Sequence, residues 1–199
     1  MSKRRRFQRP VGVRHYRKLI VIATEGSKTE PQYFSLFNNQ ESVIKSYCLK
    51  CRHDSAPPNV LKRMKNYLEN SGLRFTDEAW LVVDRDHWTE EQLDQLYHWS
   101  EQAENYGFAL SNPRFEYWLL LHFEDGCGIA GAQECSDRLK RHLPDYKKNI
   151  DPRKFMPDTI DAAISRASRR DHPPCADWPR LVGSTTVYRL VRKLLGVSD

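Results

Sequence analysis

The sequence lacks any apolar segment long enough to cross a membrane. A spanning helix needs about 18 consecutive apolar residues, and no stretch of the 199 residues approaches that length. The opening residues, MSKRRRFQRP, are basic, but the apolar segment of a secretory signal does not follow them. We therefore expect a cytoplasmic protein that does not associate with membranes.

Cysteine does not occur in the pattern of a disulfide-stabilised protein. The chain has five cysteines, an odd number, and no export signal that would carry it to an oxidising compartment. We therefore predict free thiols. The five residues are Cys48, Cys51, Cys127, Cys135 and Cys175.

Acidic residues are absent from the first eighteen positions, and the whole chain has a formal net charge of +6. Residues 1–17 are predicted to form a basic N-terminal arm, in which Arg4, Arg5 and Arg6 are consecutive. A cationic arm gains affinity for nucleic acid because binding releases counterions from the phosphate backbone. The alternative is a solvated tail without a partner, and charge alone does not separate the two.

Apolar runs typical of buried strands alternate with segments of helical periodicity. Strands are predicted at residues 19–23, 42–49, 79–84 and 108–110. Helices are predicted at 29–38 (with Thr29 as N-cap), 59–70, 89–105 and from 115 onward. Because helices connect successive strands, the sheet should be mostly parallel and covered on both faces.

The pattern changes at about residue 126, after which it is helical without strands. Helices are expected at about 132–142, 158–169 and 185–195. We therefore predict a single α/β protein with a Rossmann-type, mostly parallel sheet of about four strands at residues 18–125. A helical C-terminal extension at residues 126–199 should pack on this core.

Acidic residues directly follow two of the predicted strands. Glu25 follows the first, and Asp84 and Asp86 end the third. Because the carboxyl ends of parallel strands open onto one edge of the sheet, these side chains should lie together. The period-two alternation of a strand should send both aspartates to one side and Arg85 to the other. Carboxylates, water and substrate phosphate are typical ligands of Mg²⁺, so this edge is a candidate site for Mg²⁺ or Mn²⁺; the alternative is helix capping or loop solvation.

Three longer motifs follow one another along the chain: IVIATEGSKTEPQYF at 20–34, LVVDRD at 81–86 and SNPRFEYWLLLHF at 111–123. Together they resemble the RloB-like family. The likeness also reaches Tyr146-Lys147 and residues 184–191 and covers roughly residues 15–195. The family is regarded as a branch of the Toprim fold, in which a glutamate after the first strand and an Asp-x-Asp pair after the third bind divalent metal.

The resemblance implies a Toprim-like catalytic core and assigns its acidic residues. Glu25 matches the first-strand glutamate, Asp84 and Asp86 match the acidic pair, and Glu116 matches the family's Asn-Pro-x-Phe-Glu motif. These four are the candidate catalytic residues and metal ligands of a metal-dependent nuclease, in which one or two ions activate water and stabilise phosphoryl charge.

Several cations near these motifs are candidates for binding substrate phosphate, although each is equally well an ordinary solvated charge. They are Lys28, Arg85 and Arg114, together with the arginines of the N-terminal arm. His122 shares a helix face with apolar residues, and we expect it to be a hydrogen-bonded core residue.

RloB-like proteins are associated with phage-defence and restriction loci, often beside an ATPase partner. The resemblance therefore implies a nuclease effector of anti-phage defence or abortive infection that cuts DNA or RNA and works with an ATPase, and it leaves room for a homo-oligomer. The alternative is a non-catalytic nucleic-acid-binding or regulatory subunit of a defence complex.

A third hypothesis is a zinc module, because Cys48-x-x-Cys51 is followed by His53. Tetrahedral zinc needs a fourth ligand, and the nearest candidates, Cys127 and Cys135, are distant and do not form a second Cys-x-x-Cys pair. A small buried residue is the simpler interpretation of Cys48.

Overall fold

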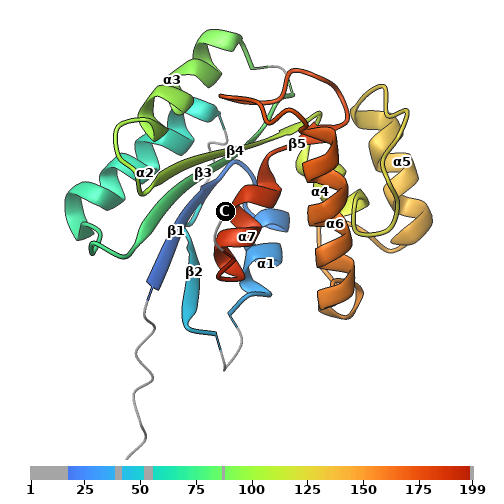
Figure 1. Ribbon diagram of the computed structural model, residues 1–199, viewed down its shortest axis with the longest axis horizontal. Coiled ribbons are helices and arrows are strands. Elements are labelled where there is room, and N and C mark those ends of the chain that lie inside the picture. The colour runs from blue at the N-terminus through green and yellow to red at the C-terminus, as the bar shows by residue number, and fades with distance from the viewer. Residues whose placement is uncertain (1–17, 39–41, 52–55, 87, 198–199) are drawn as a thin grey trace, which may run out of the picture.

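The computed structural model describes residues 18–38, 42–51, 56–86 and 88–197. A five-stranded sheet in the order β2-β1-β3-β4-β5 forms its centre (Figure 1). Strands β1 to β4 run parallel to one another, and β5 is antiparallel to β4. The predicted α/β fold with a mostly parallel sheet is confirmed. The strands are β1 (Lys18–Thr24), β2 (Ile44–Cys48), β3 (Glu78–Asp84), β4 (Tyr106–Asn112) and β5 (Ser184–Thr185).

Helices cover both faces of the sheet (Figure 1). One face carries α2 (Pro57–Ser71) and α3 (Glu90–Ser100). The other carries α1 (Thr29–Ser35), α4 (Phe115–Leu120) and α7 (Val187–Leu194). Two further helices, α5 (Ala132–His142) and α6 (Pro157–Arg170), pack against α4, and a short 3-10 helix at Pro152–Lys154 precedes α6.

Side chains of each central strand alternate between two apolar clusters. In β1, Ile20 and Ile22 belong to the cluster beneath α1, α4 and α7, whereas Val21 and Ala23 belong to the cluster beneath α2 and α3. All four are fully buried. A strand buried on both faces is apolar at every position, which is why β1 appears in the sequence as a continuous apolar run.

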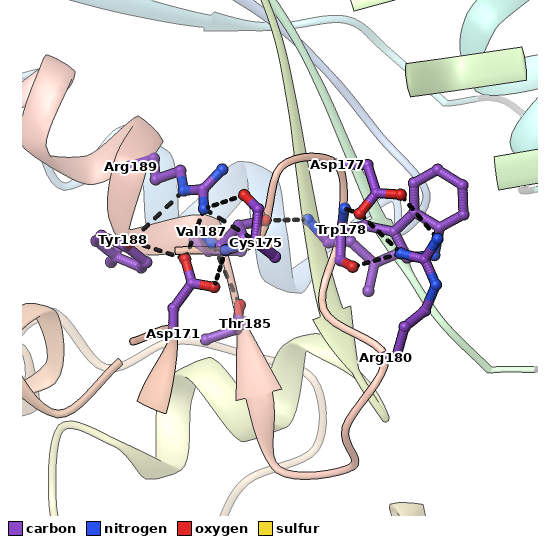
Figure 2. A network of polar contacts seen from close by, with 11 residues as sticks. Asp171, Cys175, Asp177, Trp178, Arg180, Thr185, Val187, Tyr188 and Arg189 are labelled. Atoms are coloured by element: carbon purple, nitrogen blue, oxygen red, sulfur yellow. Dashed lines mark hydrogen bonds and ion pairs between the residues drawn. The ribbon is translucent and has the colours of Figure 1, made fainter. Parts of the chain in front are cut away.

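A polar network holds the connection between α6 and β5 (Figure 2). Asp171 is only 5% exposed and accepts hydrogen bonds from the Tyr188 hydroxyl at 2.8 Å, Arg189 Nη2 at 2.6 Å and Cys175 N at 2.9 Å. Farther along, the Arg180 guanidinium lies 3.9 Å from the ring centre of the buried Trp178. Hydrogen bonds from Tyr188 and Arg189 therefore fix the segment between α6 and β5 to α7.

The structure corrects two details of the sequence prediction. The segment after residue 126 does contain a strand, β5, whose two residues have no apolar alternation and exist as a strand only through pairing with β4. Thr29 is not the N-cap of the first helix, because Lys28 takes that position while the Thr29 hydroxyl donates to the Lys148 carbonyl at 3.1 Å.

The structure does not test two other expectations, the N-terminal arm and the division of the chain into two parts. The arm at residues 1–17, with Arg4, Arg5 and Arg6, lies outside the described residues, and the division of the chain near residue 126 stays a prediction. Across the part of the chain that the structure describes, no helix combines the length and apolar character of a membrane span.

Candidate active site

A pocket of about 290 Å³ opens at the edge of the sheet where β1 and β3 end. Two cations, Lys28 and Lys148, line it together with a group of acidic side chains. The acids come from the loop after β1, from α1, from the end of β3 and from the first turn of α4. They are Glu25, Glu30, Asp84 and Glu116.

Glu25 and Asp84 are joined directly at the ends of adjacent strands. Glu25 Oε2 accepts a hydrogen bond from the Asp84 amide at 3.1 Å, and Asp84 Oδ1 accepts one from the Phe115 amide at 2.8 Å. The indole nitrogen of Trp88 donates to the Glu25 carboxylate at 3.2 and 3.3 Å from its two oxygens. Backbone and indole donors therefore fix both carboxylates in place.

Burial and mutual repulsion shift the proton equilibria of these acids. Burial raises the pKa of Glu25 to about 7, although hydrogen bonds from Asp84 and Trp88 oppose the rise. The pKa of Asp84 lies well above its usual range because of burial and the charges of Glu30, Glu25 and Glu116. Burial and the charge of Glu116 also raise the pKa of Glu30. At neutral pH this group of acids favours binding a proton or a metal cation.

Glu30 is a pocket residue that sequence reasoning missed. It is 6% exposed, and its Oε1 accepts a hydrogen bond from the Gly26 amide at 3.0 Å. A Cβ on Gly26 would lie 2.2 Å from the Glu30 carboxylate, so only glycine leaves room for this contact. In the sequence, a glutamate in the first turn of a helix is typical of a solvated residue favoured by the helix dipole, so nothing marks Glu30 as buried.

Glu116 is held by a loop from the C-terminal part of the chain. It is 4% exposed, accepts a hydrogen bond from the Tyr146 hydroxyl at 3.0 Å, and forms an ion pair with Lys148. Lys148 has a φ of 67°, a left-handed backbone that L-residues rarely adopt. The Thr29 hydroxyl lies 3.2 Å from the Tyr146 hydroxyl, so the same loop is also bound to α1.

Asp86 does not line the pocket. β3 ends at Asp84, and Asp86 has a φ of 26°, so strand alternation does not extend to it. The predicted joint grip of both aspartates on one cation therefore has no geometric support here. Asp86 instead forms an ion pair with Arg114 at 3.2 Å, and Arg85 donates to the Trp88 carbonyl. The charge of Asp86 still contributes to the raised pKa of Glu25.

Comparison with known proteins agrees with the resemblance noted in the sequence. The model of the RloB-like protein family matches residues 20–194. This chain belongs to the RloB-like family. No curated protein and no solved structure matches it. In this RloB-like protein the match includes every acid of the pocket and the Tyr146–Lys148 loop.

Whether a metal ion fits the pocket of this RloB-like protein depends on how many protein side chains that ion needs as ligands. Among the described residues, no group of three or more His, Cys, Asp or Glu side chains is arranged to hold a metal ion. Mg²⁺, however, usually keeps several waters and is held by one or two carboxylates plus substrate phosphates. Glu25 and Asp84 form such a pair of hard oxygen donors, so they fit a divalent cation that water and phosphate complete.

His122 lies outside the pocket, in the apolar core. It is 3% exposed, its Nδ1 donates to the Trp118 carbonyl at 3.0 Å, and its Nε2 lies 3.0 Å from the Tyr33 hydroxyl. Burial lowers the pKa of His122 to about 4, so the ring is neutral at physiological pH. Such a residue orders the core and has no access to substrate.

The Cys48-x-x-Cys51 pair likewise gives little support to a zinc site. Burial, assisted by the charge of Glu30, raises the pKa of Cys48 to about 12, which disfavours the thiolate that zinc requires. Cys51 Sγ donates to the Glu25 carbonyl at 3.7 Å, and His53 lies outside the described residues.

Proposed function

We propose that this RloB-like protein is a divalent-cation-dependent nuclease that hydrolyses phosphodiester bonds at the carboxylate pocket. The observation that carries the proposal is the crowding of four acids at one edge of the sheet. Burial and repulsion raise the pKa of Glu25 to about 7 and that of Asp84 well above its usual range. Groups with strongly shifted pKa values cluster in clefts that perform chemistry, because burial and neighbouring like charges adjust their proton affinity to the reaction.

The roles of the side chains follow from their contacts. Glu25 and Asp84 would hold Mg²⁺ or Mn²⁺, which would supply an activated water and stabilise charge on the phosphoryl oxygens. Without a bound cation, Glu25 has a pKa of about 7, so near neutral pH it can release its proton and become a ligand when the cation binds. Lys28 and Lys148 line the same pocket and would bind phosphate oxygens.

The loop that carries Lys148 gives this lysine a defined position. Its ammonium group is paired with Glu116, and Tyr146 donates to the same carboxylate oxygen. Glu116 is therefore a positioning residue for Lys148, or a ligand to a second cation when substrate draws Lys148 away.

Family membership supports the biological setting. We propose that the nuclease acts on DNA or RNA as an effector of anti-phage defence or abortive infection, together with an ATPase partner that restrains or activates it. Control by a partner is expected because an unregulated nuclease would damage its own cell.

A second candidate function is a non-catalytic nucleic-acid-binding subunit of a defence complex. What favours it is that, in the described part of the chain, no three His, Cys, Asp or Glu side chains are arranged so that they could hold one metal ion. The two functions differ in their dependence on divalent cations and on Asp84.

The test is a cleavage assay with plasmid DNA, single-stranded DNA and total RNA, each with Mg²⁺, Mn²⁺ or EDTA. Asp84→Asn keeps the oxygen that accepts from Phe115 but loses the charge, so cleavage should fall by about 100-fold or more. Asp94→Asn, at an exposed position of α3, is the matched control and should cleave like the wild type. Cleavage that survives EDTA or the Asp84→Asn change would exclude the proposed chemistry.

A further inference from the structure

A second pocket, of about 370 Å³, is lined by three arginines at the C-terminal end of α6. Arg166, Arg169 and Arg170 are three and four positions apart, a spacing that places them on one helix face. The loop after α4 completes the lining with Asp125 and Cys127.

The arginines of this pocket keep their positive charge available. Arg166 donates to the Leu121 carbonyl at 2.6 Å, Arg170 donates to the Asp125 carbonyl at 3.1 Å, and Arg169 donates to a carbonyl of its own helix. Among the residues with described positions, none of the three has an ion pair within 4.0 Å. A carbonyl orients a guanidinium without neutralising it, so three charges face a single carboxylate, that of Asp125.

The arginine pocket lies on the same edge of the sheet as the carboxylate pocket. Arg170 Nη1 donates to the Gly183 carbonyl at 3.4 Å, and the Gly183 amide donates to the carbonyl of Asn112, the last residue of β4, at 2.8 Å. β4 is the direct neighbour of β3, whose end carries Asp84. Figure 1 shows α6 standing beside α4 and β5, which agrees with their contacts.

The two pockets are also linked through α4. A Cβ on Gly126, in the loop of the arginine pocket, would lie 2.9 Å from the ring and hydroxyl of Tyr117. Tyr117 is fully buried and adjacent in sequence to Glu116 of the carboxylate pocket. The loop beside the arginines therefore packs on the helix that carries one of the acids.

We propose that Arg166, Arg169 and Arg170 bind backbone phosphates of a nucleic-acid strand whose reacting phosphate lies in the carboxylate pocket. The planar guanidinium matches two phosphate oxygens at once, which suits this partner better than a point charge would. Two phosphate-binding positions along one edge fit a polymer with repeating phosphates rather than a single small anion. That the bound strand is also the substrate rests on the proposed function. Binding of the strand can be measured without cleavage.

The test measures affinity in EDTA, with a fluorescein-labelled single strand of about 30 nucleotides as DNA and as RNA. Arg166→Gln combined with Arg169→Gln should weaken binding about tenfold near physiological salt, and the slope of log affinity against log salt should shrink by about 1.4, the value for two lost contacts on a single strand. The matched control, Lys62→Gln with Lys65→Gln, removes two exposed charges from α2 on the other face and should bind like the wild type.

A single change, Arg169→Glu, guards against loss of folding, because Arg169 bonds only to a carbonyl of its own helix and is exposed. It too should weaken binding while its melting temperature stays that of the wild type. If both variants keep the affinity and the salt slope of the wild type, the proposal is wrong. The same result is expected if the arginine pocket binds an acidic protein and not nucleic acid. Weaker binding by the variants, together with cleavage that survives EDTA or the Asp84→Asn change, would uphold the proposal while rejecting the nuclease function. Unchanged binding, together with cleavage that requires the cation and Asp84, would do the reverse.

Discussion

Replacing Glu25 by glutamine should stabilise the protein at alkaline pH while abolishing cleavage. Burial raises the pKa of Glu25 from 4.5 to about 7, so the folded protein binds this proton more tightly than the unfolded chain does. The contribution of protonated Glu25 to the free energy of unfolding is fully present below pH 4.5 and is lost as the pH rises through 7. A shift of this size corresponds to about 3 kcal/mol.

Glutamine can keep the hydrogen bond from Asp84 and one of the two contacts from Trp88 without the charge of Glu25. A single carbonyl oxygen at the position of Oε2 would accept from the Asp84 amide at 3.1 Å and from Trp88 Nε1 at 3.3 Å. The free energy of unfolding of Glu25→Gln should therefore equal that of the wild type near pH 4.5 and exceed it by up to about 3 kcal/mol at pH 8.

Urea unfolding in EDTA at several pH values between 5 and 8 measures this difference. Glu69→Gln, at an exposed position of α2, is the matched control, and its difference from the wild type should stay within about 0.5 kcal/mol at every pH. If Glu25→Gln differs from the wild type by the same amount at all pH values, or is less stable at pH 8, the electrostatic account of the pocket is wrong.

Four further substitutions test other parts of the structure, each by urea unfolding. Lys148→Met should cost about 1 kcal/mol, because it removes the cation that forms an ion pair with buried Glu116; an unchanged free energy of unfolding would contradict this. Asp171→Asn should cost about 3 kcal/mol, since it breaks a buried ion pair, and a loss below about 1 kcal/mol would show that the network is unimportant. Gly126→Ala and Gly128→Ala share a positive φ, but only the first places a Cβ 2.9 Å from other side chains, so it should cost about 2 kcal/mol more; equal losses would refute the contact.

Much of the fold was predictable because local signals agree with the final packing. β1 and β3 are buried on both faces and therefore appear as apolar runs, and Thr89 with Gln92 forms the capping box that starts α3. β5 was not predictable, because its two residues become a strand only when the chain returns to β4 from far along the sequence.

The site was predictable only where strand ends determine it. Glu25 and Asp84 follow neighbouring parallel strands, so topology alone brings them together. Lys148 reaches the pocket through a long-range ion pair with Glu116, and Glu30 is buried although it lies in the first turn of a helix, so neither has a local signal in the sequence. The side of the sheet on which Asp86 lies was not predictable from alternation, because β3 ends two residues before it.

Anomalous diffraction from crystals soaked in Mn²⁺ is the most direct test of the central claim. We expect an anomalous peak within coordination distance, about 2.0 to 2.3 Å, of carboxylate oxygens of both Glu25 and Asp84, and its loss in Asp84→Asn crystals. A protein that cleaves nucleic acid in the same Mn²⁺ buffer but shows no manganese at this pocket, or shows it only elsewhere, would contradict the claim.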